Sequence, residues 1–189
     1  MGEDGWAVLV PVKAFAAAKR RLAPVLDAAQ RAELARAMAR TVLEAALPLP
    51  RYVACDDSGV AAWAEAIGAQ VIWTPGLGLN GAVTRGVEVL SDRGFGQVVV
   101  AHADLPGATA LAPLTGFSGV TLVPDRREDG TNVACIPAGA GFVFSYGPGS
   151  FGRHRAEANR LGLELRVALV ADLQWDVDTP DDLAVPAVV

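Results

Sequence analysis

Hydrophobic segments alternate with amphipathic segments along most of the chain. Nearly continuous apolar runs occupy residues 6–12, 51–55, 70–73 and 97–103. The amphipathic stretches that follow them, and that are expected to cover them as helices, are residues 28–47, 58–68, 80–90 and 108–114. Continuous apolar strands are typical of a sheet buried on both faces, which requires parallel strands with covering helices. The pattern therefore predicts an α/β sandwich.

The second half of the chain has a different pattern. Three strand candidates follow one another without room for helices between them: residues 119–125, 132–137 and 142–147. A helix from about Ser150 to Leu161 and a strand over 164–170 come next. Closely spaced strands indicate an antiparallel element. We therefore expect a mostly parallel mixed sheet in a three-layer sandwich, and a single domain over residues 1–189, because the sequence has no linker or repeat.

Composition and charge narrow the class of protein. Hydrophobic residues make up 52% of the chain, but charges, Gly or Pro interrupt every apolar run before the ~18 residues of a membrane span. The net charge of −5 argues against general nucleic-acid binding. Acids stand where a signal peptide has its basic region, and Cys55 and Cys135 have no partner at disulfide or zinc spacing. We expect a cytoplasmic protein with reduced thiols that binds neither nucleic acid nor membrane.

A glycine-rich segment, Gly76-x-Gly78-x-x-Gly81, has the spacing of a dinucleotide-binding turn. Such a turn should follow the first strand, and a carboxylate should end the second strand to hold the ribose. Here the segment follows the third strand candidate, and Asp92 precedes the next strand instead of ending one. A dinucleotide-dependent oxidoreductase is therefore only a minor alternative.

Carboxylates gather at two places where a ligand is expected. Asp104 follows the fourth apolar run, at the sheet edge where such folds bind ligands. Asp176 and Asp178 have the i, i+2 spacing that puts both on one face of an extended chain, and a bound Mg²⁺ would remove their repulsion. The alternatives are a solvated acidic turn for this pair and an ordinary turn for Asp104. Asp181 and Asp182 follow a Thr-Pro pair typical of a helix start, so we assign them a capping role.

The basic residues are unevenly distributed. Of 16 Lys and Arg, the two lysines, Lys13 and Lys19, both follow the first apolar run. This clustering is either chance or a requirement for compact ammonium groups that contact phosphates, and the sequence leaves both open. Another anomaly is the first turn expected after an N-cap at Ser150, where Arg153 and His154 oppose the helix dipole. An anion on the Gly147–Ser150 loop would remove this conflict, whereas side chains extended into solvent would only reduce it.

A basic loop, strand-end carboxylates and a second anion site together describe metal-dependent nucleotidyl transfer. The motifs that carry a closer likeness occur in this order: VPVKAFAAAKRRL, GLGLNGAV, ADLP, PDRREDGTN, GPGSF and DVDTPDDL. With these motifs the chain closely resembles the 2-phospho-L-lactate/phosphoenolpyruvate guanylyltransferases of coenzyme F-420 biosynthesis. The likeness covers nearly the whole chain and departs from the family's pattern at Arg20, which leaves open which cation of this loop contacts phosphate.

The resemblance implies a GT-A-like, Rossmann-like nucleotidyltransferase fold, with GTP as donor, Mg²⁺ as cofactor and a small phosphorylated three-carbon acid as acceptor. It places the metals on Asp104, Asp176 and Asp178. It gives the acceptor acid to Thr131, Gly147 and Ser150. It turns Lys13 and Lys19 toward the triphosphate, as catalytic groups together with Asp104, and puts Pro75, Gly76 and Asn80 on the nucleotide side. The acceptor stays open between phosphoenolpyruvate, 2-phospholactate and 3-phosphoglycerate, as does the oligomeric state.

Two other functions compete with this interpretation. A related enzyme would transfer a nucleotide to a sugar phosphate or to molybdopterin, and the small GPGSF loop without sugar-binding aromatics argues against it. A non-catalytic nucleotide-binding module would have no use for the mutually repelling pair Asp176 and Asp178. Residue types and spacing alone assign no role to His102, which we expect to be packed, or to His154.

Overall fold

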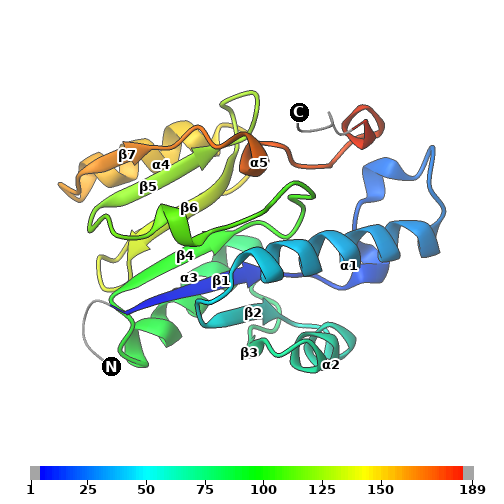
Figure 1. Ribbon diagram of the computed structural model, residues 1–189, viewed down its shortest axis with the longest axis horizontal. Helices are drawn as coiled ribbons and strands as arrows, with labels where there is room; N and C mark the ends of the chain where they lie inside the picture. The colour runs from blue at the N-terminus through cyan, green and yellow to red at the C-terminus, as the bar shows by residue number, and fades with distance from the viewer. Residues whose placement is uncertain (1–4, 185–189) are drawn as a thin grey trace.

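The computed structural model describes residues 5–184, which form one seven-stranded sheet with helices on both faces (Figure 1). The strands are β1 (Trp6–Pro11), β2 (Arg51–Cys55), β3 (Gln70–Trp73), β4 (Gln97–Ala101), β5 (Val120–Pro124), β6 (Thr131–Pro137) and β7 (Leu165–Val167). Their order in the sheet is β3-β2-β1-β4-β6-β5-β7. Strand β6 pairs antiparallel with β4 and β5, and the other neighbours pair in parallel. The predicted mixed, mostly parallel sheet is confirmed.

Helices follow the strands as the amphipathic pattern predicts for the first half of the chain. They are α1 (Ala28–Ala45), α2 (Ser58–Ala66), α3 (Gly78–Asp92), α4 (Ser150–Arg160) and the short α5 (Ala171–Gln174). Helix α1 begins at a capping box, because the Asp27 carboxylate accepts from the Gln30 backbone N–H and the Gln30 side chain accepts from the Asp27 N–H. Sequence-local signals therefore define where this helix starts.

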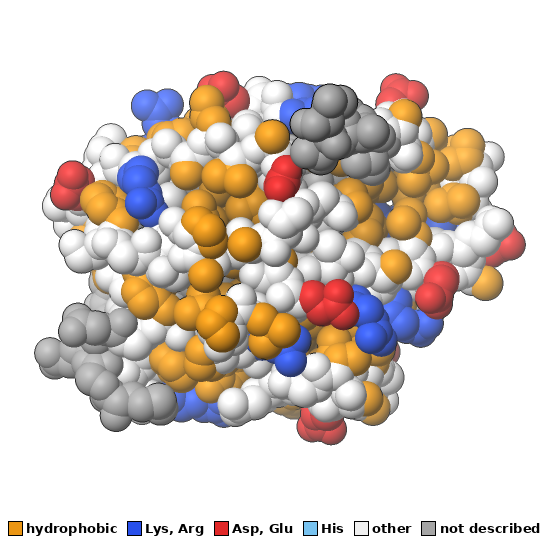
Figure 2. All heavy atoms as spheres, in the orientation of Figure 1, with side chains coloured by type: hydrophobic (Ala, Val, Ile, Leu, Met, Phe, Trp, Pro, Cys, Tyr) orange, Lys and Arg blue, Asp and Glu red, His pale blue; other side chains and the backbone are white. Residues whose placement is uncertain are grey.

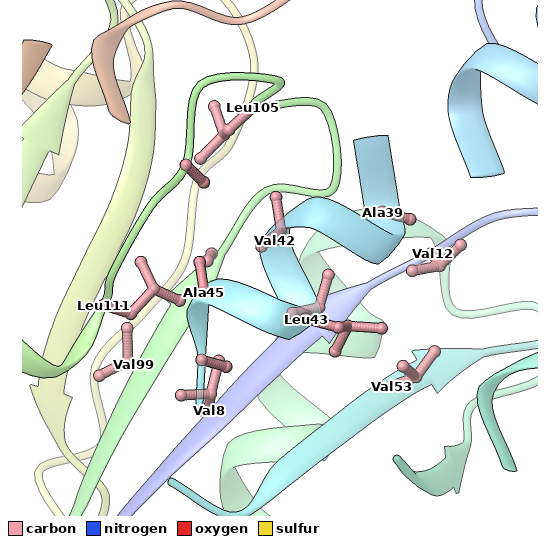
Figure 3. Close-up of a cluster of buried hydrophobic side chains, with 14 of the residues drawn as sticks. Val8, Val12, Ala39, Val42, Leu43, Ala45, Val53, Val99, Leu105 and Leu111 are labelled. Carbon is pink, nitrogen blue, oxygen red and sulfur yellow. The ribbon is translucent and has the colours of Figure 1, made fainter. Parts of the chain in front are cut away.

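Alternate residues of the strands supply two separate cores. Val8 and Val10 of β1 belong to the core under α1 and α2, whereas Ala7 and Leu9 belong to the core under α3 and α4. Figure 3 shows the first core, with Val42 and Leu43 of α1 over the sheet. On the opposite face, a Cβ added to Gly86 of α3 would lie 2.5 Å from a Leu9 methyl carbon. A glycine at this position allows α3 to approach the sheet closely.

The carboxyl ends of β1 to β4 meet at one edge of the sheet, because these four strands are parallel. The antiparallel strand β6 begins at the same edge, where Val133 pairs with Ala101 and the His102 N–H donates to the Asn132 carbonyl. Loops from both halves of the chain therefore converge beyond this edge, which is where ligands bind in such sheets.

Two sequence expectations about secondary structure are wrong. Residues 142–147 form no strand: their backbone N–H groups donate to side chains instead, Val143 to Glu157, Ser145 to His154 and Tyr146 to Asn80. The segment is still extended, with every second side chain buried, which is why its sequence pattern is that of a strand. Residues 108–114 form a loop with only a 3₁₀ turn, Ala112–Leu114, that contains a proline.

The face that carries α1 shows no large field of one charge sign (Figure 2). Acidic and basic side chains lie near each other around this face, and the area between them is mainly hydrophobic or uncharged. None of the helices within residues 5–184 is both long enough and apolar enough to cross a membrane.

Candidate active site

A cavity of about 620 Å³ opens beyond the carboxyl ends of the strands. Segments far apart in the sequence surround it: the loop after β1, the loop after β4, the β5–β6 loop, the loop before α4 and the C-terminal tail. The sequence-predicted residues in its lining are Lys13, Lys19, Asp104, Thr131, Gly147, Ser150, Asp176 and Asp178. The structure thus brings together eight of the eleven residues expected at the site.

A smaller hollow of about 230 Å³ adjoins the cavity at the ends of β1, β2 and β3 and the start of α3. The two spaces share the lining residues Pro11, Val12, Lys13 and Leu79. Lys13 is exposed and therefore stands between a larger polar compartment and a smaller, mainly apolar one. Such a pair of compartments suits a ligand with one charged part and one flat apolar part.

Lys19 lies against Asp104 in the larger cavity. Its Nζ is 2.6 Å from Asp104 Oδ2, and both side chains are mostly buried. The Lys19 backbone has a φ of 52°, a left-handed conformation that is rare for a residue other than glycine. Burial raises the pKa of Asp104, but the charge and hydrogen bond of Lys19, together with His102 and the backbone, outweigh it, so the pKa lies below the ordinary value. The other oxygen, Oδ1, is buried without a hydrogen-bond partner among the described residues.

The C-terminal tail brings two more carboxylates to the cavity. Its path is fixed by the Val177 N–H, which donates to the Asp104 carbonyl, and by the buried Val177 side chain. Asp176 and Asp178 both line the cavity on either side of Val177, as the i, i+2 spacing predicts. Burial, followed by the negative charge of Asp104, raises the pKa of Asp176. The Asp178 carboxylate is paired with the Arg21 guanidinium.

Within residues 5–184 no three His, Cys, Asp or Glu side chains are grouped closely enough to hold a metal ion as they stand. Cations of the protein occupy the carboxylates instead, Lys19 on Asp104 and Arg21 on Asp178. The unpartnered Oδ1 of Asp104 and the raised pKa of Asp176 nevertheless indicate local excess of negative charge, which a divalent cation with oxygen ligands would relieve. Carboxylate oxygens are the ligands that Mg²⁺ takes, so the three side chains would fit this ion once Lys19 and Arg21 release them.

Asp182 has the structural role that its place in the sequence predicts, but a larger one. Its Oδ2 accepts from the N–H groups of Asp178 and Thr179 and from the Thr179 hydroxyl, which starts the 3₁₀ helix Pro180–Leu183. Its Oδ1 pairs with Arg126, whose guanidinium lies over the Trp175 ring. Asp182 is 2% exposed. The interpretation as a helix cap alone is therefore incomplete, because a buried ion pair also holds the tail.

Three polar side chains, two of which line the cavity, form a connected group at the starts of β6 and α4. The Ser150 hydroxyl oxygen accepts from the Thr131 backbone N–H at 3.0 Å, and His154 Nδ1 lies 3.0 Å from Thr131 Oγ1. His154 Nε2 accepts from the Ser145 N–H at 3.0 Å. Burial, followed by the nearby charge of Arg153, lowers the pKa of His154 to about 4. The imidazole is therefore neutral at ordinary pH.

The start of α4 differs from the sequence expectation in two respects. Gly149, with a φ of 72°, is the N-cap, and Ser150 is the first helical residue, because its hydroxyl turns inward to the Thr131 N–H. Arg153 already has partners within the protein, because its guanidinium donates to the carbonyls of Ser145 and Pro148. These carbonyls compensate the charge in the first turn, so Arg153 is explained without either alternative that the sequence left open, an anion or extension into solvent.

The expected nucleotide-side residues in the glycine-rich segment lie outside both linings. Pro75 and Gly76 are exposed and belong to neither set of lining residues. Asn80 uses its side-chain oxygen to accept from the Tyr146 N–H at 2.7 Å, which ties α3 to the loop before α4. Thr74 and Leu79, from the same stretch, line the smaller hollow instead.

Sequence reasoning missed Asp56 and Asp125. Asp56 follows β2 directly and lines the smaller hollow, and a search of every strand end for acids would have found it. Asp125 follows β5 and lines the larger cavity, where its carboxylate accepts from the N–H groups of Asp129 and Gly130. That contact shapes the β5–β6 loop, and no motif in the sequence distinguishes it from an ordinary turn.

The fold and the site define the class of protein: an α/β protein of the nucleotidyltransferase type. Among solved structures, a putative nucleotide-diphospho-sugar transferase from Desulfovibrio desulfuricans G20 superposes with a TM-score of 0.75 at 20% identity, over 97% of this chain and 85% of the other. CMP:2-keto-3-deoxy-manno-octonic acid synthetase, solved with CTP, gives a TM-score of 0.60 at 14% identity over 95% of each chain. At these identities the likeness shows the fold alone.

Residues 6–185 match the family described as "Guanylyl transferase CofC like", and the chain belongs to that family. Proteins named phosphoenolpyruvate guanylyltransferase are similar along the same length. The one from Rubrobacter xylanophilus is 36% identical over 93% of this chain and 90% of its own, and the one from Sphaerobacter thermophilus is 35% identical over 93% and 89%. The family expected from the ordered motifs is confirmed.

Proposed function

We propose that this protein is a phosphoenolpyruvate guanylyltransferase that acts in coenzyme F-420 biosynthesis. A phosphate oxygen of phosphoenolpyruvate attacks the α-phosphorus of GTP, the bond between the α-phosphorus and its bridging oxygen breaks, and pyrophosphate leaves. The observation that carries the proposal is a cavity whose lining brings the lysines and carboxylates together with the hydroxyls of Thr131 and Ser150. The relatives at 35–36% identity support the choice of substrates.

The nucleotide occupies the side of the cavity near β1. Lys13 stands between the two compartments, where an exposed ammonium suits a triphosphate that connects them. Lys19 and Arg21 are held by carboxylates that a metal ion would recruit. When those carboxylates are taken, both cations become available to the phosphates, which keeps Lys13 and Lys19 as the proposed triphosphate contacts.

The smaller hollow takes the base. Its lining is mainly apolar side chains and backbone, with the Asp56 carboxylate next to the end of β2 as the acidic group. Guanine presents N1–H and an amino group along one edge, and a carboxylate accepts both at once. Adenine presents a ring nitrogen acceptor at the corresponding position, which a carboxylate repels. Asp56 is therefore the proposed base-reading residue, in place of Pro75, Gly76 and Asn80.

Asp104 and Asp176 are the proposed holders of Mg²⁺, with Asp178 as the third carboxylate after Arg21 releases it. The metal would neutralise charge on the triphosphate and polarise the α-phosphorus. The protein's own contribution is positional: the hydrogen bond between the Val177 N–H and the Asp104 carbonyl sets the spacing of the carboxylates before any ligand arrives. Asp182 anchors the same tail from the other end.

The acceptor lies across the cavity, against Thr131, Gly147 and Ser150. Thr131 and Ser150 are 1% and 2% exposed, so their hydroxyl groups are fixed by their surroundings. Gly147 has a φ of 117°, which lets the backbone come close to a ligand without a side chain in the way. The loop around Gly147 and Ser150 offers small polar groups and backbone to a phosphorylated acid, and residues 147–150 place no aromatic side chain in the cavity lining for a sugar ring, which disfavours the rival transferases.

A pyrophosphate-release assay tests the proposal. GTP, ATP and CTP are each combined with phosphoenolpyruvate, 2-phospho-L-lactate and 3-phosphoglycerate in the presence of Mg²⁺. We expect turnover with GTP and phosphoenolpyruvate, weaker turnover with 2-phospho-L-lactate, and background rates with ATP or CTP. Release from GTP with a sugar phosphate but with none of the three acids would overturn the assignment.

A further inference from the structure

His154 is a buried titratable group that the proposed reaction does not use. It lies within α4, is 0% exposed, and contacts both the loop before α4 and the first residue of β6. Both ring nitrogens have a polar partner, as a buried imidazole requires. The direction of each of these two hydrogen bonds can be worked out from the partners themselves.

The hydrogen bond from Ser145 fixes the tautomer of the imidazole. A backbone N–H can only donate, so Nε2 must be the acceptor and carries no proton. The ring is neutral because its pKa is lowered to about 4, so its one proton is on Nδ1. Nδ1 then donates to Thr131 Oγ1 at 3.0 Å. The Thr131 hydroxyl therefore acts as an acceptor toward His154.

A hydroxyl that already accepts from inside the protein keeps its own proton for another partner. Thr131 lines the cavity, and the hydrogen bonds of residues 5–184 include no protein acceptor for that proton. Ser150 repeats the arrangement, because its oxygen accepts from the Thr131 N–H and its side chain also lines the cavity. The two hydroxyls are thus prepared as donors toward the same space.

We propose that His154 is a positioning residue for acceptor binding: by donating from Nδ1, it turns the Thr131 hydroxyl into a donor directed at the anionic group of the acceptor acid. The inference rests on the proposed function for the identity of that acid. Without His154 the hydroxyl is free to rotate, and part of its population would present a lone pair to the anion. Orientation fixed in advance costs nothing at the moment of binding.

Steady-state kinetics with GTP and phosphoenolpyruvate test this role through matched variants. In His154→Asn the side-chain amide nitrogen takes the place of Nδ1 and still donates to Thr131. In His154→Gln the longer side chain places its amide near Nε2, beside Ser145, and leaves Thr131 without a donor. We expect His154→Gln to raise the KM for phosphoenolpyruvate about tenfold, and His154→Asn to raise it no more than about threefold. The KM for GTP should change less than about twofold in both.

The Thr131→Val background separates positioning from general packing. Because His154 acts only through the Thr131 hydroxyl, His154→Gln should add less than about a twofold change in the phosphoenolpyruvate KM when Thr131 is valine. A tenfold effect that persists in that background, or an equal rise in the GTP KM, would overturn the proposal. So would a His154→Asn variant as impaired as His154→Gln.

A spectroscopic measurement tests the tautomer independently of activity. The chain has two histidines, so long-range ¹H–¹⁵N correlation spectra of wild type and His154→Asn identify the His154 ring nitrogens by difference. We expect the proton on Nδ1 at pH 7. A proton on Nε2 contradicts the inference. If this tautomer is found but wild type releases no pyrophosphate with phosphoenolpyruvate, the proposed function fails while the orientation of Thr131 stands.

Discussion

The two sides of the cavity are built from different kinds of contact. Near β1, opposite charges face one another directly, with Lys19 against Asp104. Near α4, the hydroxyls of Thr131 and Ser150 and the neutral ring of His154 bond to one another or to the backbone, and the charged Asp129 and Arg153 bond to the backbone of the loop before α4. A charged pair can exchange partners when a triphosphate and a metal ion arrive. The uncharged donors are fixed in place and need no rearrangement. The proposed nucleotide side is thus adaptable, and the proposed acceptor side is preformed.

The largest expected effect comes from removing a charge beside Lys19, on the side of the cavity near β1. Asp104→Asn keeps the size of the side chain but removes the charge that Lys19 neutralises and that a metal would need. We expect kcat to fall about 10³-fold at ordinary Mg²⁺, because several kcal/mol of charge stabilisation disappear. Asp92→Asn, on the exposed end of α3, is the matched control and should be unchanged. A near-normal rate for Asp104→Asn would remove the carboxylate from the chemistry.

The tail that carries two of the carboxylates depends on Asp182. Asp182→Asn loses the buried ion pair with Arg126 and weakens the contacts to Asp178 and Thr179. The free energy of unfolding should therefore fall by about 2–3 kcal/mol. The neighbouring Asp181 is exposed, and Asp181→Asn should change stability by less than about 0.5 kcal/mol. Urea denaturation of both variants checks the difference. Equal stabilities would mean that the ion pair contributes nothing.

The neutral His154 ring should make the free energy of unfolding depend on pH. Folded His154 resists protonation until about pH 4, whereas in the unfolded chain the imidazole takes up its proton near the ordinary histidine pKa of 6.5. The contribution of the neutral His154 ring to the free energy of unfolding is therefore complete above pH 6.5, is lost as pH falls from 6.5 to 4, and amounts to about 3 kcal/mol. Urea midpoints of wild type should fall more steeply across this range than those of His154→Asn. Parallel curves would contradict a neutral buried ring.

A smaller effect concerns the base. Asp56→Asn should raise the KM for GTP about tenfold. It should also reduce the preference for GTP over ATP, because an amide can donate to the adenine ring nitrogen. The matched control is Asp57→Asn, since Asp57 caps α2 through the Val60 N–H and an asparagine caps nearly as well. An unchanged preference in Asp56→Asn would place the base elsewhere.

The sequence is most informative where local rules apply. Parallel strands under covering helices follow from the apolar pattern, and the shared face of Asp176 and Asp178 follows from a two-residue period. The extended segment 142–147 has the pattern of a strand without being one. Alternation with a period of two shows which side chains are buried, but it does not show whether the backbone pairs with another strand. Its N–H groups bond to side chains of α3 and α4, which only the tertiary structure brings near.

Sequence patterns also do not predict hydrogen bonds between polar side chains and distant segments around the site. Arg153 donates to a loop carbonyl, and the Asn80 side chain accepts from the Tyr146 N–H, 66 residues away. Neither contact has a periodicity or a motif. The ordered family motifs identify segments that line the two cavities, yet the role of each side chain within a segment depends on distances that spacing along the chain does not determine.

The division of the cavity into a nucleotide side and an acceptor side is tested most directly by crossed binding measurements. Calorimetry would measure GTP and phosphoenolpyruvate binding to Lys13→Ala and to Thr131→Val, each at fixed Mg²⁺. We expect Lys13→Ala to weaken GTP about tenfold and leave phosphoenolpyruvate within about twofold, and Thr131→Val to do the reverse. If Lys13→Ala weakened only phosphoenolpyruvate, or if both variants weakened both ligands equally, the two-sided account would be contradicted.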